Sequence, residues 1–80
     1  MSAGQAAPAR PVKLEVNRHG LYRDVVTFDA SDEIAEANVR QAVELLGMVD
    51  RKAAFRVVSC GAYGGPLLHY SAQHGWTPAG

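Results

Sequence analysis

Residues 31–49 form a single amphipathic segment, and this segment constrains the fold more than any other part of the chain. Apolar side chains recur at helical spacing, and charged side chains occupy the opposite half of the helical projection. We expect Ser31 to be the N-cap of a helix and Gly47 to end it. A helix with one apolar stripe has to cover one face of a sheet. The stripe consists of Ile34, Ala35, Val39, Ala42, Val43, Leu45, Leu46 and Val49.

Runs with strand character flank this helix, two on each side. Residues 12–17 alternate between apolar and polar, and residues 21–29 are rich in β-branched and aromatic residues. The sequence RHG at 18–20 between them suits a short hairpin loop. Residues 53–60 and 67–74 make the second pair, joined by a glycine-rich turn. We therefore predict an α+β domain of order ββαββ, in which two β-hairpins form an antiparallel or mixed four-stranded sheet with the helix on one face.

The length allows one small domain. The chain has 80 residues, and its first ten, MSAGQAAPAR, offer nothing that would anchor a core. We predict a disordered tail at 1–10 and a single domain at 11–77. A core of this size contributes roughly 3–5 kcal/mol of net stability. Because one cysteine excludes an internal disulfide, self-association is a plausible further source of stability.

Charge and hydropathy exclude several classes of protein. Eight Lys and Arg residues balance eight Asp and Glu residues, which argues against a binder that depends on phosphate contacts. No apolar run is long enough to span a membrane, and the start of the sequence lacks the pattern of a signal peptide. We therefore expect a cytoplasmic protein. The frequent Ala, Arg and Gly residues suit a bacterial or phage origin.

The predicted sheet would have an apolar second face. Simple alternation places several large apolar side chains on the face away from the helix, and there is no second helix to cover them. An uncovered apolar patch marks a site of association. We predict a small non-catalytic protein–protein interaction module, a homodimer or a binder of another protein, acting as a binding inhibitor or accessory protein. The predicted contact residues are Leu21, Val25, Val58 and Leu67, with Tyr63 and Trp76 at the margin.

The segment from Cys60 to His74 contains residue types that could form a chemical site. Cys60, His69 and His74 have the spacing C-x8-H-x4-H, whereas structural zinc sites pair close ligands and need four of them. On one strand His69 and His74 would face opposite sides of the sheet. We therefore predict no metal and no cofactor. A small enzyme in which His69 lies opposite Cys60 and activates its thiol is the third hypothesis for function.

A nucleic-acid-binding accessory protein is the second hypothesis. Its cations would come from loops and strands, and salt would weaken its binding steeply. Gly61, Gly64 and Gly65 do not favour a phosphate loop, because a proline and a strand follow them instead of a helix. The cations of this hypothesis are Arg18, His19, Arg23, Arg51, Lys52 and Arg56.

Overall fold

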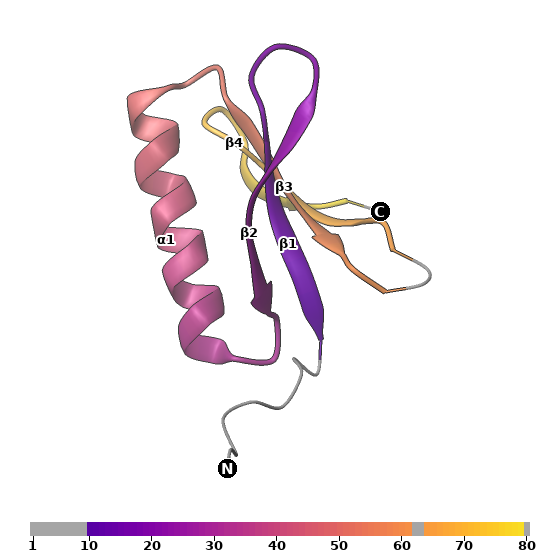
Figure 1. Cartoon of the computed structure of the whole chain (residues 1–80). Coiled ribbons are helices and arrows are strands. Elements are labelled where there is room, and N and C mark those ends of the chain that lie inside the picture. The colour runs from indigo at the N-terminus through magenta and orange to yellow at the C-terminus, as the bar shows by residue number, and fades with distance from the viewer. Residues whose placement is uncertain (1–9, 62–63, 80) are drawn as a thin grey trace.

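The computed structural model describes residues 10–61 and 64–79, and it consists of one sheet with one helix against it (Figure 1). The α+β class is confirmed. The sheet has five strands where four were predicted, so the order is ββαβββ and the predicted ββαββ order is wrong. Most of the predicted tail, residues 1–9, lies outside the described residues. The elements are β1 (Pro11–Asn17), β2 (Tyr22–Asp29), α1 (Glu33–Val49), β3 (Ala54–Ser59), β4 (Pro66–Ser71) and β5 (Gly75–Pro78).

The strands lie in the order β2-β1-β3-β4-β5, and every neighbouring pair is antiparallel. β1 therefore has β2 on one side and β3 on the other. The chain leaves β2, passes through α1 and returns on the far side of β1 as β3. Figure 1 shows α1 on one face of the twisted sheet, which leaves the other face open.

The fifth strand arises because the predicted 67–74 strand ends early. β4 stops at Ser71, whose Oγ accepts a hydrogen bond from the His74 backbone N–H at 3.1 Å. Gly75 then has φ +69°, a backbone conformation that glycine adopts without strain. The chain reverses, and Trp76 comes to lie opposite Tyr70. A strand of four residues with glycine at one end and proline at the other gives little periodic signal in the sequence.

Both predicted ends of the helix differ from the observed ones. Asp32 is the N-cap, because one of its carboxylate oxygens accepts the backbone N–H groups of Ile34 and Ala35, each at 3.1 Å. The hydroxyl of Ser31 instead donates to Asp29 at 2.7 Å. At the other end the helix continues through Gly47 and is capped by Asp50. Ser31 and Gly47 are residue types that commonly cap helices. Here the Ser31 hydroxyl is bonded to Asp29 at the end of β2 and Gly47 packs against Tyr70, so neither residue caps α1.

The core lies between the middle of α1 and the strands β1 and β3. Val43 is the one large helix residue that is fully buried in the described part of the chain. Gly47, one turn later, is also buried because it packs against the ring of Tyr70. The remaining helix apolar residues are half-buried or exposed, so α1 contributes a narrow stripe to the core. The buried apolar residues are Val12, Leu14, Val43, Ala53, Phe55 and Val57.

Two β-bulges interrupt the alternation of the sheet. In the β1–β2 pair the register shifts after Leu14, which leaves Val25 as the extra residue of β2. In the β3–β4 pair the register shifts after Val57, which leaves Leu67 as the extra residue of β4. Beyond a bulge, the residues of that strand change faces relative to simple alternation. Both bulges fall at residues that were predicted to form the second apolar face.

Candidate functional site

The predicted apolar second face is not formed, and the bulges are the reason. Leu21 lines a hollow together with Val16, which packs against the core. Val25 lines another hollow together with α1. Leu67 lines a third one beside Leu68, again on the helix side. Of these four predicted contact residues, Val58 alone lies on the open face, opposite Lys13.

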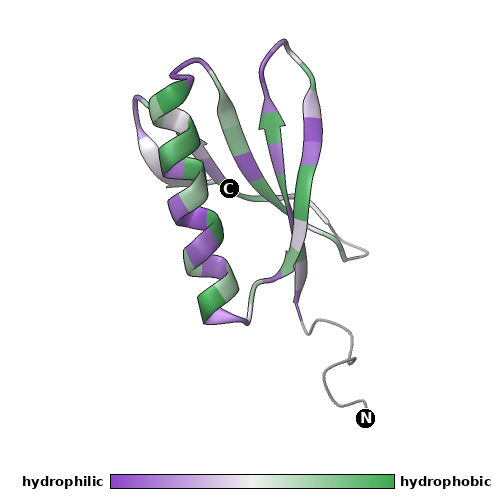
Figure 2. Ribbon diagram, turned by 60° about the vertical axis from the view of Figure 1, so that its left-hand side comes forward, coloured by the Kyte–Doolittle hydropathy of each residue, from purple (hydrophilic) through white to green (hydrophobic). Residues whose placement is uncertain are grey.

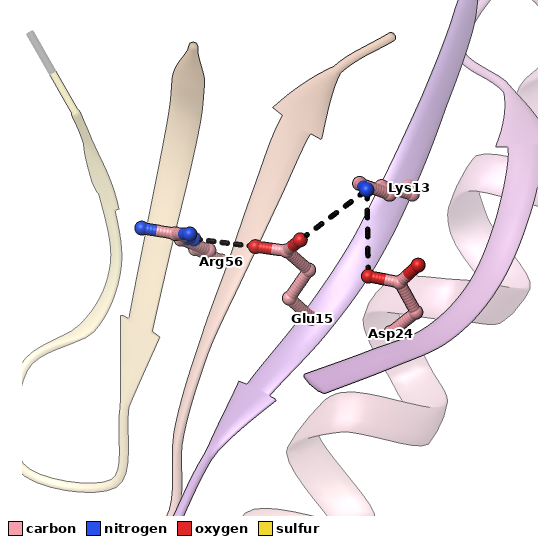
Figure 3. A network of polar contacts seen from close by, with 4 residues as sticks. All are labelled: Lys13, Glu15, Asp24 and Arg56. Carbon is pink, nitrogen blue, oxygen red and sulfur yellow. Dashed lines mark hydrogen bonds and ion pairs between the residues drawn. The ribbon is translucent and has the colours of Figure 1, made fainter. Parts of the chain in front are cut away.

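The open face carries instead a network of charged side chains from three neighbouring strands (Figure 3). The Lys13 ammonium lies 3.4 Å from Asp24 Oδ1 and 3.6 Å from Glu15 Oε2. Arg56 Nε donates to Glu15 Oε1 at 2.6 Å. These contacts link β2, β1 and β3 across their width, so this part of the open face is polar and cross-linked.

Glu15 is the centre of that network. It is only 7% exposed, and two cations compensate its carboxylate. The guanidinium carbon of Arg56 also lies 3.7 Å from the centroid of the Tyr22 ring, a cation–π contact. The hydrogen bond and charge of Asp24 raise the pKa of Lys13 above its ordinary value of 10.5. The network therefore balances two cations against two carboxylates and links three strands.

Exposed apolar residues gather on a different part of the molecule. Of the nine large exposed hydrophobic residues in the described part of the chain, eight lie on α1, on β2 or at Leu21 just before β2. Figure 2 shows hydrophobic residues in the C-terminal turns of α1 and again in its first turn, separated by a more hydrophilic middle. We call the flank that α1 and β2 share the α1–β2 surface. Its residues are Leu21, Val25, Val26, Leu46 and Val49.

The α1–β2 surface contains an open hollow of about 280 Å³. Val25 of β2 borders it on one side, and Leu46 and Val49 of α1 border it on the other. An ion pair at 3.1 Å between Arg18 Nε and Asp50 Oδ2 joins the β1–β2 turn to the end of the helix beside this hollow. Val49 is 86% exposed, although most of the residues that line the hollow with it are apolar.

On the flank away from this hollow, side chains of α1 contact β4 and β5. Trp76 Nε1 donates to Glu44 Oε2 at 3.1 Å, and the Arg40 guanidinium lies 5.3 Å from the Trp76 ring centroid. Gly47 lets the helix backbone approach Tyr70 closely. These contacts pack one flank of α1 against β4 and β5, whereas Leu46 and Val49 on α1 and Val25 on β2 are exposed. Trp76, a predicted contact residue, is thus half-buried against α1, and Tyr63 lies outside the described residues.

Cys60, His69 and His74 do not come together in the structure. His69 lies opposite Arg56, so Cys60 is four positions further along β3, at about 13 Å by the rise of a strand. The predicted Cys60–His69 pairing across the hairpin is therefore wrong. His74 lies in the turn after β4. Within residues 10–61 and 64–79, no group of three His, Cys, Asp or Glu residues is placed to hold a metal ion.

The cations of the nucleic-acid hypothesis are dispersed over the molecule. Arg56 is engaged with Glu15 and Tyr22 on the open face, and Arg18 is paired with Asp50 beside the helix. Arg23 lines a hollow with Leu21 on the helix side. The three arginines therefore lie on both faces of the sheet.

No helix in the described part of the chain is long and apolar enough to cross a membrane. No protein-family model, curated protein or solved structure matches this chain.

Proposed function

We propose that this chain is a non-catalytic protein–protein interaction module that forms a homodimer through the α1–β2 surface. One observation carries the proposal: exposed apolar side chains coincide with the edge strand β2, which has a strand neighbour on one side only among the described residues. Apolar patches and open strand edges are both features through which proteins associate. A role as a binding inhibitor or accessory protein is part of this proposal.

A second copy of the chain is the partner that suits this surface. When two β2 strands pair antiparallel about a two-fold axis, the two sheets become one and both helices lie on the same face. In this antiparallel pairing the start of each β2 lies beside the end of the partner's β2. The same arrangement brings apolar side chains that each core leaves exposed onto one continuous face of the joined sheet: Val25, Val26, Leu46 and Val49.

Sedimentation velocity over a range of micromolar concentrations tests the proposal. We expect the wild type to sediment as a dimer and Val49→Glu to sediment as a monomer, with a dissociation constant raised at least about 100-fold. Met48→Glu is the matched control, because Met48 is the adjacent residue of α1, is 73% exposed and lies outside the α1–β2 surface. This variant should remain a dimer.

A wild type that is monomeric throughout the range would overturn the homodimer. A dimer that resists Val49→Glu would show that another surface makes the contact. Circular dichroism of each variant gives the control for folding, since both substitutions are at exposed helix positions.

A further inference from the structure

The N-terminal half of α1 stands away from the sheet. Val43 is fully buried and Gly47 contacts Tyr70, so the later turns of the helix are closely packed. One turn before Val43 the position that faces the sheet is Val39, which is only half-buried. Two turns before Val43 this position is Glu36, which is charged. A hollow of about 290 Å³ lies between these earlier turns and the sheet, at the opposite end of α1 from Val49. This volume is near the lower end for small-molecule sites.

The floor of this hollow is apolar and includes side chains from all five strands. Phe28 of β2 and Val12 of β1 lie opposite each other, and Val57 of β3 lies opposite Leu68 of β4. Trp76 of β5 completes the floor. Such a floor suits an aliphatic chain or an aromatic ring.

The mouth of the hollow is positively charged. Arg10, Arg40 and Glu36 line it. Arg40 Nη2 lies 3.3 Å from Glu36 Oε2, so these two charges offset each other. The guanidinium of Arg10 has no ion pair or hydrogen bond within residues 10–61 and 64–79, where Arg10 bonds through its backbone alone. Among the described residues that line the hollow, two arginines and one glutamate leave a balance of one positive charge.

The acidic residue that is hydrogen-bonded to Arg10 is Asp29. Its carboxylate accepts the backbone N–H groups of Arg10 and Ser31 and the hydroxyl of Ser31. It is absent from the lining of the hollow, whose charged residues are Arg10, Arg40 and Glu36.

We propose that this hollow binds a small amphipathic monocarboxylate, with its apolar part on the sheet floor and its carboxylate against the Arg10 guanidinium. Arginine suits a carboxylate because it donates two parallel N–H groups to the two oxygens. The volume suits a ligand of about ten non-hydrogen atoms. This site is separate from the α1–β2 surface and does not depend on dimer formation.

The chain carries its own reporter for this test. Trp76 is the sole tryptophan and lines the hollow. Octanoate and 1-octanol are the probes, because they share an alkyl chain and differ in the charge of the head group. Octanoate, kept below the concentration at which it forms micelles, should change the Trp76 emission saturably, and 1-octanol should require about ten times the concentration.

Arg10→Gln should weaken octanoate about tenfold and leave 1-octanol unchanged. Arg51→Gln is the matched control, because Arg51 is exposed in the turn after α1, at the other end of the helix. It should change neither probe. Both variants should show the wild-type Trp76 emission before ligand is added, which reports that the hollow is intact.

Three results would overturn the proposal. The first is a Trp76 emission that does not saturate with octanoate. The second is equal binding of the two probes to the wild type, and the third is unchanged binding of octanoate to Arg10→Gln. None of these results bears on the homodimer, which is measured by sedimentation without ligand.

Discussion

Glu15 has a strand partner on each side, and its charge is balanced by one cation on its own strand and one on the next. Lys13 lies two residues earlier on β1, and Arg56 lies directly opposite Glu15 on β3. The alternation of residues 12–17 predicted that Lys13, Glu15 and Asn17 share a face, and the pairing of β1 confirms this. The partners on β2 and β3 could not be predicted, because register is set by pairing between distant segments.

Asp24→Asn should lower the pKa of Lys13 towards 10.5. Asp24 is the largest cause of the raised pKa, through its hydrogen bond and its charge. Since a raised lysine pKa means that the folded state favours the charged form, the pair stabilises the fold below 10.5 and loses this effect as the pH rises through the higher folded value. NMR titration of the Lys13 side chain above pH 9 measures the change.

Asp32→Asn is the control for that titration. Asparagine also caps a helix, so the fold is retained while one acidic charge is removed at a site that does not contact Lys13. A pKa of Lys13 that falls equally in both variants would indicate a general charge effect and contradict the role of Asp24.

At the scale of the element, Gly47 determines how closely α1 approaches the sheet. A Cβ at this position would lie 2.9 Å from Tyr70 Cε1. The ring of Tyr70 has little freedom to move, because Phe55 and Trp76 pack against it with centroids at 6.3 and 5.1 Å. The glycine is therefore retained inside a helix although alanine has the higher helix propensity.

Gly47→Ala should lower the free energy of unfolding by about 1–3 kcal/mol, because the added methyl group overpacks the contact with Tyr70. Urea denaturation measures the change. In a Tyr70→Leu background the same substitution should be neutral or stabilising. Ala37→Gly, at an exposed position of α1, gives the cost of glycine in this helix without a packing change, about 1 kcal/mol. Stabilisation by Gly47→Ala in the wild-type background would contradict the close contact.

The elements that depend on local signals were predicted well. The apolar repeat of residues 31–49 predicted the helix, and the loop with Gly20 predicted the first hairpin. In the structure Gly20 has φ +88°. The bulges at Val25 and Leu67 and the short strand β5 were missed, because each depends on how one strand pairs with another. The side chains of Val25 and Leu67 were assigned to the wrong face of the sheet for the same reason, since a bulge changes the alternation of the strand.

For the whole molecule, the two edge strands should behave differently on association. β2 is eight residues long and contains no proline, whereas β5 has four residues and ends in Pro78. Proline and short length protect an edge from pairing, so β2 is the edge through which a homodimer forms.

Hydrogen exchange at low and high protein concentration measures this difference. Outward-facing amides of β2 should exchange more slowly at the concentration where the dimer forms, and those of β5 should not change. Val49→Glu should abolish the concentration dependence. Protection of β5 instead of β2 would contradict the proposed arrangement.

The central place of β1 has a consequence for how the chain folds. β1 meets β2 through a loop of a few residues, but it meets β3 only after α1 has passed over, and Glu15 and Arg56 are separated by 41 positions. Such distant pairing is slow to form, because the connecting loop has to close first. Until then the inner edge of β1 is exposed, and β3 of a neighbouring chain is as good a partner as its own. At high concentration during refolding, exchange of β3 between two chains competes with the native fold.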